Sequence, residues 1–199
     1  MEFSEVVRRR RMIRHYTDEP LDPAIVERVL ANALRAPSAG FSQGWAFLVL
    51  TDPVDRARFW PFVPTRVEQT PTMQDAPLVV VPLANRSAYL ERYAEPDKGW
   101  EDRAEARWPA PYWFIDTGMA SLLVLLGAVD EGLAGCFFGV PPEHQAAVLA
   151  AFGVPAGRRV VGVCSLGYAA PDRRSPSLRR GRRPVAEVAH DGRFGTPFG

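Results

Sequence analysis

The residues best suited to binding chemistry in this chain are arginines, which gather in two groups. The first group runs from Arg8 to Arg14 and the second from Arg173 to Arg183. A guanidinium is planar and donates paired hydrogen bonds to a phosphate, so each group is a candidate anion site. If the first segment is helical, Arg10 and Arg14 share a face because they lie four residues apart. The competing interpretation is a solvated basic surface, which is what runs of charge usually form.

A loop of small and hydroxyl-bearing residues, from Pro37 to Gly44, is the second candidate. It follows a predicted helix and precedes a predicted strand, and its small side chains would let a ligand approach the backbone closely. The alternative is an ordinary connection between helix and strand, with Trp45 in the core.

The third candidate is a segment rich in glycine, from Gly132 to Gly139. Glycines leave main-chain N–H groups accessible, so a ligand atom could be bound by backbone alone. Gly132 also fits the C-cap of a helix, where glycine is common. That second interpretation leaves Gly135 and Gly139 unexplained.

Composition and spacing argue against several classes of function. The formal net charge is only +1, which gives no support to nucleic-acid or membrane binding. Cys136 and Cys164 lie far apart, and no cysteine–histidine spacing suits zinc. The sequence has no G-x-G-x-x-G, P-loop or G-x-S-x-G motif. It begins without a signal-peptide pattern, and its most apolar run, Met119–Val129, is shorter than the ~20 residues of a membrane span, so a cytoplasmic, soluble protein is expected.

The elements that must position these residues suit one domain with a sizeable core, since 47% of the 199 residues are hydrophobic. Asp22 is a predicted N-cap, with Pro23 in the first turn of a helix that Pro37 ends. The other predicted elements are a short helix from Phe3; strands over Ala46–Thr51, Leu78–Leu83, Cys136–Val140 and Arg159–Gly167; helices over Asp55–Arg66, Phe114–Glu131 and Pro142–Phe152; an irregular stretch over Tyr89–Pro111; and an extended Pro184–Val188 in the tail. Helices and strands mix without βαβ alternation, which indicates an α+β fold. Phe114–Glu131 is apolar nearly all round, so this helix should be buried at a domain centre or a subunit interface.

Taken in order along the chain, these motifs resemble the pattern of the nitroreductase family. The matching positions are Arg10, Arg14 and Tyr16; Ala36-Pro37-Ser38 with Gln43 and Trp45; Gly132-Leu133 with Cys136-Phe137; Leu166-Gly167-Tyr168; and Arg180, Arg182 and Arg183 with Pro184–Val188. The resemblance covers almost the whole chain, although Phe59–Trp113 carries no motif. Each match alone is weak, and it is their number and order that carry the resemblance.

The resemblance implies a nitroreductase-like α+β fold, with a central, mostly antiparallel sheet flanked by helices, in an intertwined homodimer. Residues 1–199 would form one domain, with 59–113 as a lid or insertion and 170–199 as an arm that wraps the other subunit. Several aromatic residues within 59–113 could stack on a planar substrate or could equally be core. They are Trp60, Phe62, Tyr89, Tyr93, Trp100 and Trp108.

Two FMN sites at the dimer interface are implied as well. Arg10, Arg180 and Arg182 would contact the FMN phosphate. Arg14 would lie near the pyrimidine edge of the flavin, where a cation stabilises the reduced ring. Cys136 would be a small packing residue, not a nucleophile.

Two other segments complete the implied cofactor site. The loop around Ser38 would line the ribityl chain and ring edge, and main chain near Gly135 would face the flavin N5. The full set of expected cofactor contacts is Arg10, Arg11, Met12, Arg14, Pro37, Ser38, Ala39, Phe41, Gly135, Cys136, Arg180 and Arg182. No side chain is expected to act as an obligatory acid or base, and none to bind a metal.

The implied reaction is ping-pong: NADH or NADPH reduces FMN, which then reduces a quinone, nitroaromatic or activated alkene. Three positions depart from the family pattern. Met12 stands where serine is common, Phe41 where asparagine is common, and Gly44 where proline is common. Phe41 adds bulk near the ring. Two alternatives therefore stay open, namely a protein that binds a flavin or the deazaflavin F420 with little turnover, and a dimer that has lost its cofactor.

Overall fold

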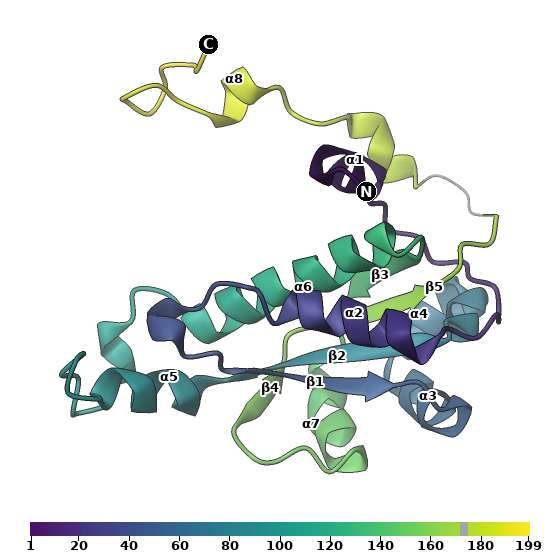
Figure 1. Cartoon of the computed structure of the whole chain (residues 1–199), viewed down its shortest axis with the longest axis horizontal. Helices are drawn as coiled ribbons and strands as arrows, with labels where there is room; N and C mark the ends of the chain where they lie inside the picture. Colours follow the sequence, from purple (N-terminus) through teal and green to yellow (C-terminus); the bar gives the residue numbers. More distant parts are fainter. Residues whose placement is uncertain (172–174) are drawn as a thin grey trace.

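The computed structural model describes residues 1–171 and 175–199, which build one sheet with helices on both faces (Figure 1). The strand order is β1-β2-β5-β3, and β4 pairs with β2. Every pairing between these strands is antiparallel. The strands are β1 (Trp45–Leu50), β2 (Leu78–Asn85), β3 (Ala134–Phe138), β4 (Arg158–Val160) and β5 (Val163–Gly167). The expected α+β fold with a mostly antiparallel sheet is confirmed.

Helices cover both faces of this sheet, and the last helix of the chain lies away from it (Figure 1). The α-helices are α1 (Phe3–Arg9), α2 (Pro23–Ala33), α3 (Pro53–Phe59), α4 (Pro64–Gln69), α5 (Arg86–Ala94), α6 (Tyr112–Asp130), α7 (Pro142–Ala151) and α8 (Val185–Val188). The expected N-cap at Asp22 is confirmed, because its carboxylate accepts a hydrogen bond of 2.9 Å from the Ala24 N–H. α2 ends at Ala33, which is earlier than the stop predicted at Pro37.

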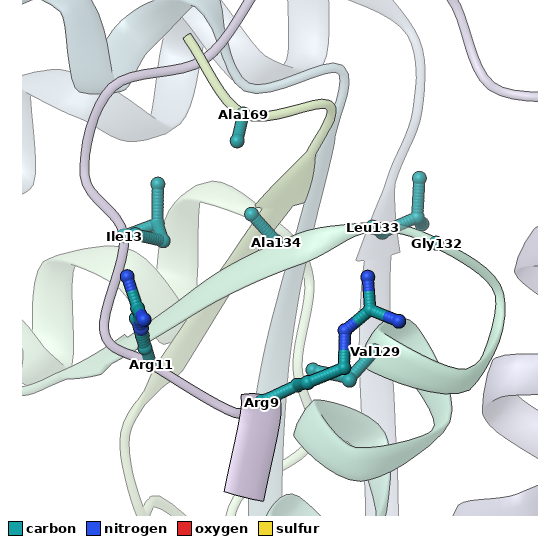
Figure 2. Close-up of a pocket in the computed structure, with 8 residues that line it drawn as sticks. All are labelled: Arg9, Arg11, Ile13, Val129, Gly132, Leu133, Ala134 and Ala169. Atoms are coloured by element: carbon teal, nitrogen blue, oxygen red, sulfur yellow. The ribbon is translucent and has the colours of Figure 1, made fainter. Parts of the chain in front are cut away.

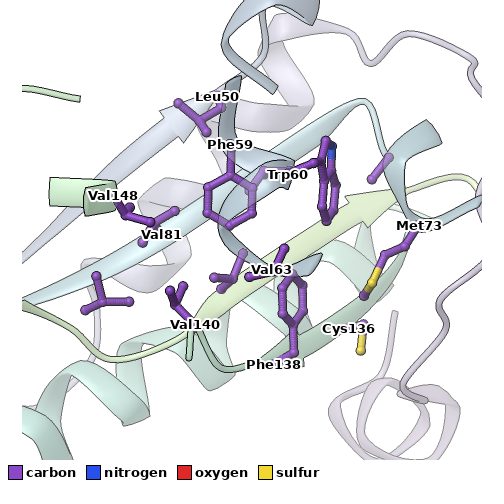
Figure 3. Packing of buried hydrophobic residues seen from close by; sticks show 14 of the residues in the cluster. Leu50, Phe59, Trp60, Val63, Met73, Val81, Cys136, Phe138, Val140 and Val148 are labelled. Carbon is purple, nitrogen blue, oxygen red and sulfur yellow. The ribbon is translucent and has the colours of Figure 1, made fainter. Parts of the chain in front are cut away.

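Strand β2 is buried on both faces and divides the core into two clusters. Leu78 and Val80 pack with α2 and α6, whereas Val79 and Val81 pack on the opposite side with Phe59. This alternation follows from the two-residue period of a strand. Figure 3 shows the second cluster, in which Trp60 stacks on Phe138 with ring centroids 6.3 Å apart.

Helix α6 is the longest element and packs against α2 and the sheet. By length and hydropathy alone it could cross a membrane, but half of the segment is buried inside the fold, which is the pattern of a core helix. Ile115 and Leu122 on its outer face are 43% and 48% exposed. The helix therefore has one buried face, and its outer face also carries apolar residues, which are exposed.

The predicted single strand over Arg159–Gly167 is two strands, β4 and β5. β2 pairs with β5 over residues 78–80 and with β4 over residues 83–85, and the break falls beside Pro82. Proline has no N–H to donate to a ladder, so regular pairing on this side of β2 is interrupted there. The Pro82 carbonyl instead accepts a hydrogen bond of 3.0 Å from Val161 N–H.

Two stretches that were predicted to be irregular or extended are helical. α5 occupies the start of Tyr89–Pro111, and the Asn85 side chain caps it by accepting from Ser87 N–H. Pro184–Val188 contains the short helix α8 in place of an extended segment.

The span 59–113 contributes much of the core. Phe59, Trp60 and Met73 are buried, and β2 runs through the middle of the sheet. Within the span 59–113, which the sequence predicts to be a lid or insertion, residues 86–111 lie between the end of β2 and the beginning of α6.

Candidate functional site

The arginine segment runs beside β3 as extended chain. α1 ends at Arg9, and Ile13 N–H donates a hydrogen bond of 3.0 Å to the Gly135 carbonyl. Met12 and Gly135 form a parallel bridge, and Phe137 N–H lies 3.3 Å from the Met12 sulfur. The condition under which Arg10 and Arg14 would share a helix face is therefore not met, because main-chain pairing with β3 holds this segment extended.

Arg10 and Arg14 nevertheless line the same cavity. Its volume is about 510 Å³, and it is lined by Arg8, Arg10, Arg11, Met12, Ile13, Arg14, Ser175, Ser177, Leu178 and Arg182. We call it the arginine cavity. Arg182 is the residue of the second arginine group that lines this cavity together with the first group. Arg180 lies at the end of a 3₁₀ turn and is not among the lining residues, and Arg173 lies outside the described residues.

A smaller cavity of about 240 Å³ lies against the same segment (Figure 2). Arg9, Arg11 and Ile13 line it, over a floor that includes Val129 and Leu133. Arg11 and Ile13 line both cavities, whereas Arg10 and Arg14 line only the larger one and Arg9 only the smaller. Arg9 is paired with Glu5 at 3.3 Å, so its charge is partly compensated.

Gly135 and Cys136 are buried in β3, between β5 and the arginine segment. A side chain at Gly135 would lie 2.6 Å from the Leu166 side chain and 3.0 Å from that of Leu125. Close packing therefore explains this glycine, which the sequence left unexplained. The Cys136 thiol is 1% exposed and belongs to the core, as a packing residue would.

The loop around Ser38 lies beside the beginning of α6 and is fixed by its own chain. Asp116, a residue of α6 that is 1% exposed, accepts hydrogen bonds from Ala39 N–H at 2.8 Å and from the Tyr89 hydroxyl at 2.9 Å. The Ser38 hydroxyl oxygen accepts from Gln43 N–H at 3.0 Å. Burial and the hydrogen bond to Asp116 raise the pKa of Tyr89 far above its usual value, so this hydroxyl stays a donor.

The backbone of this loop is left-handed at three positions, namely Gly40, Phe41 and Gln43, with φ of 61°, 55° and 48°. The Arg92 guanidinium holds the turn by donating a hydrogen bond of 2.9 Å to the Gly40 carbonyl. A bulky residue such as Phe41 rarely adopts a positive φ, so its backbone is strained. Its side chain is 75% exposed. The loop therefore presents an aromatic ring to its surroundings from a constrained backbone.

Gly44 is explained by its neighbour. A side chain at this position would lie 2.4 Å from the Tyr89 ring. Tyr89 is in turn fully buried in an aromatic cluster that includes Tyr93, Trp108 and Trp113. The departure from the family's proline at this position thus follows from the ring that occupies the space.

The six aromatic residues that could have been substrate contacts divide into two groups. Trp60 and Tyr89 are buried core residues, and Phe62 packs against the core. Tyr93, Trp100 and Trp108 form one half-buried cluster, with the Tyr93 and Trp108 centroids 4.5 Å apart. This cluster borders the Ser38 loop, since the Tyr93 ring lies 2.6 Å from where a Gly40 side chain would be.

The two halves of the expected site lie at opposite ends of α6 (Figure 1). Asp116 holds the Ser38 loop, whereas Val129 lines a cavity with Arg9 and Arg11. These two helix residues are separated by 13 positions, which at ~1.5 Å each is roughly 20 Å. One chain therefore brings Arg10, Arg11, Met12, Arg14 and Arg182 together beside Gly135 and Cys136, but not with Pro37, Ser38, Ala39 and Phe41.

Two residues that hold the Ser38 loop were not identified from the sequence, namely Asp116 and Arg92, and Tyr89 was considered only as a substrate contact or a core residue. A signal for Asp116 was available. It is the only charged residue between Pro111 and Asp130, and a lone carboxylate in an apolar helix needs hydrogen-bond donors. Arg92 gave no comparable signal, because its role depends on a turn 52 residues away.

Known proteins resemble this chain in sequence along most of its length. The family model described as "Nitroreductase family" matches residues 7–168. A protein of Archaeoglobus fulgidus, named by inference as an NADH dehydrogenase/NAD(P)H nitroreductase, is 30% identical over 84% of this chain and 85% of its own length. The NADH dehydrogenase of Thermus thermophilus is 29% identical over 82% of this chain and 85% of its own.

Solved structures share the fold at lower identity. A nitroreductase family protein of Streptococcus pneumoniae superposes with a TM-score of 0.74 at 18% identity, covering 96% of this chain and 100% of its own. A nitroreductase-type protein of Exiguobacterium sibiricum, solved in complex with FMN, gives a TM-score of 0.67 at 22% identity, covering 92% and 98%.

Proposed function

This chain belongs to the nitroreductase family of oxidoreductases, and we propose that two copies of it bind FMN between them and use NADH or NADPH to reduce a quinone, nitroaromatic or similar electrophile. The observation that carries the proposal is the separation of the arginine cavity from the Ser38 loop along α6. A site that needs both halves must draw them from two chains. The FMN complex of the Exiguobacterium neighbour supports the choice of cofactor.

The outer face of α6 and the Ser38 loop support a homodimer. Ile115 and Leu122 on α6 and Phe41 on the loop are large apolar residues that are at least 43% exposed in one chain. Ile115 and Leu122 are seven residues apart and so lie on one face of α6, and exposed apolar residues grouped in this way are typical of a protein–protein contact. A second copy that covers this face would carry its arginine cavity toward the first copy's Ser38 loop.

The donor set of the arginine cavity fits the phosphate of FMN. Its polar lining consists of guanidinium and hydroxyl groups, and no carboxylate lines it among the described residues. Arg10 and Arg182 would hold the phosphate through paired hydrogen bonds. Arg14 would lie at the pyrimidine edge of the flavin, with Arg11 and Met12 beside it.

Bound FMN would supply hydride transfer, which no side chain of the chain can perform. The chain's own contribution is binding and orientation. The Asp116 carboxylate and the Arg92 guanidinium hold the Pro37–Phe41 backbone in place before any ligand arrives. The half-buried cluster of Tyr93, Trp100 and Trp108 next to that loop would bound the space open to a planar acceptor.

Two further features belong to the proposal. Residues 170–199 would act as the arm that wraps the second copy, since most of their described part is exposed. The protein would work in the cytoplasm.

The two alternatives stand differently. F420 binding is not supported by the named relatives, whose names refer to NADH, NAD(P)H and FMN. The cofactor-free alternative remains an outcome of the test below.

The first experiment is the absorption spectrum of the purified protein with FMN added to the apo form. We expect a bound flavin spectrum that bleaches with NADH or NADPH and recovers with a quinone. A colourless protein that ignores FMN would exclude the proposal and favour a cofactor-free dimer. Binding without reduction would favour a flavin carrier.

A complementation experiment tests whether the site is shared. Arg10→Gln and Ser38→Trp each damage one half, so neither homodimer should bind FMN well. When the two variants are co-expressed with different tags, the mixed dimer contains one site with both defects and one intact site. We expect half-occupancy of the mixed dimer with FMN. No recovery would show that both halves serve sites within one chain.

A further inference from the structure

The arginine cavity holds more positive charge than a single phosphate needs. Five arginines line it, namely Arg8, Arg10, Arg11, Arg14 and Arg182, and two serine residues join them. No acidic side chain lines the cavity in the described parts of the chain. A phosphomonoester carries only about −1.5 to −2 at pH 7, so FMN alone would leave part of the charge of Arg8, Arg10, Arg11 and Arg182 uncompensated.

Elsewhere in the chain some arginines are paired, and others, such as Arg35, Arg58 and Arg159, form no ion pair within the described residues. Arg28 pairs with Glu131 at 2.7 Å, Arg92 with Asp97 at 2.7 Å and Arg107 with Asp102 at 2.9 Å. Even Arg183, the neighbour of Arg182, pairs with Glu187 at 3.1 Å. What distinguishes the cavity is that several arginines share one space without an acidic residue among its described lining.

Four of the cavity arginines have no such partner. Within residues 1–171 and 175–199, Arg8, Arg10, Arg11 and Arg182 form no ion pair. Like charges gathered in one cavity repel one another unless an anion fills it. The chain has 23 acidic residues, yet none of those described pairs with these four arginines. The uncompensated charge therefore indicates a ligand with more than one anionic group.

We propose that the arginine cavity binds two phosphate groups, as in the diphosphate of a dinucleotide. Arg10 and Arg182 hold the first phosphate, and Arg8 and Arg11 hold the second, beside Ser175 and Ser177. The inference rests on the proposed function for the first phosphate and extends it to a second. A volume of about 510 Å³ lies within the range of sites for ligands of this size.

A dinucleotide diphosphate could come from two sources. One is FAD, bound in place of FMN, and the other is the nicotinamide donor, whose diphosphate would lie beside the FMN phosphate. Both sources require the same recognition chemistry, which is paired hydrogen bonding from guanidinium groups to adjacent phosphates.

The decisive test uses the full-length apo protein and inorganic anions, so it does not depend on activity. Calorimetric titration should show that pyrophosphate binds at least tenfold more tightly than phosphate. In the double variant Arg8→Gln/Arg11→Gln this preference should fall to threefold or less. The matched control is Arg183→Gln, which removes one charge from the same tail outside the cavity and should keep the preference.

Two results would overturn the proposal. One is equal affinity of the wild-type protein for phosphate and pyrophosphate, and the other is a preference that survives in Arg8→Gln/Arg11→Gln. FMN binding without a pyrophosphate preference would overturn this inference alone. A pyrophosphate preference without any flavin binding would overturn the proposed function and leave the diphosphate site standing.

Dinucleotide titrations then identify the source. If FAD binds the apo protein more tightly than FMN, and Arg8→Gln/Arg11→Gln removes the difference, the diphosphate belongs to the flavin. If instead the variant weakens NADH or NADPH binding to the FMN-loaded protein more than it weakens FMN binding to the apo protein, the diphosphate belongs to the donor. If neither dinucleotide depends on Arg8 and Arg11, the diphosphate assignment is wrong.

Discussion

At the beginning of α6, buried groups of the same chain fix the loop that carries Ala39. Near the end of α6, by contrast, four arginines of the cavity have no ion-pair partner in the described residues and would be compensated only by a bound anion. Asp116 and Tyr89 satisfy each other and the Ala39 N–H within a well-packed aromatic region. Arg8, Arg10, Arg11 and Arg182, by contrast, form no ion pair within the described residues. The two halves of one candidate site are thus held by opposite means.

This difference indicates that folding orders one half of the site and ligand binding stabilises the other. The loop half is ordered during folding, so little conformational entropy is lost there when a ligand binds. The arginine half gains its favourable electrostatic contacts only when an anion arrives, so ligand binding should stabilise the folded chain. Variants of the first half should change stability without ligand, and variants of the second should change binding.

The largest effect is expected from Asp116→Ala. The change leaves the partly buried Ala39 N–H and the buried Tyr89 hydroxyl without an acceptor, which should lower the free energy of unfolding by about 2–4 kcal/mol. Urea denaturation of the apo protein measures this. Asp102→Ala is the control, because that carboxylate pairs with Arg107 at the surface and should cost about 1 kcal/mol or less. Equal losses in the two variants would show that Asp116 does not hold the loop.

Arg10→Gln should show the reverse pattern. Losing a charge-assisted contact to phosphate removes about 1.5–3 kcal/mol, so the Kd for FMN should rise roughly tenfold to a hundredfold. The unfolding of the apo protein should change little, since Arg10 has no ion-pair partner within the described residues to lose. Quenching of FMN fluorescence measures the affinity, with Arg183→Gln as the control. A variant that unfolds more easily but binds FMN normally would reverse the comparison between the two halves.

The same division separates what the sequence could predict from what it could not. Local patterns predicted α2 with its Asp22 cap, the buried strand β2 and the apolar helix α6, because periodicity and capping act over a few residues. The extended course of Arg10–Arg14 was missed, since it depends on pairing with β3, more than a hundred positions away along the chain.

For the site itself, the motifs identified candidate residues but not their arrangement. Ser38 and Arg10 occur early and close together in sequence, yet α6 separates their segments by roughly 20 Å. The hydrogen bond between Asp116 and Ala39 spans 77 positions, and no local signal links its two partners. Long-range contacts of this kind need the folded chain, whereas the chemistry of each segment can be read from its residues.

Tyr89→Phe should produce a smaller loss than Asp116→Ala. The Phe side chain keeps the ring beside Gly44, and Asp116 keeps the Ala39 N–H as a donor, so about 1 kcal/mol should be lost. The comparison with Asp116→Ala in the same denaturation series shows how much of the loss in unfolding free energy comes from the hydrogen bond between Asp116 and the Ala39 N–H. If Tyr89→Phe costs as much as Asp116→Ala, the phenol hydroxyl and not the loop N–H is the main partner.

Two substitutions of Phe41 are compared with each other. Because φ is 55° at this residue, glycine relieves backbone strain there and alanine does not, so Phe41→Gly should be more stable than Phe41→Ala by about 1 kcal/mol. Both variants lose the same exposed ring, so the difference between them reports the backbone alone. Both should also weaken the dimer if the ring contacts a second copy, and dilution in analytical ultracentrifugation measures this. An alanine variant as stable as the glycine variant would mean that the loop changes its backbone conformation to relieve the strain. The hydrogen bonds from Asp116 and Arg92 would then hold the loop less rigidly than their geometry indicates.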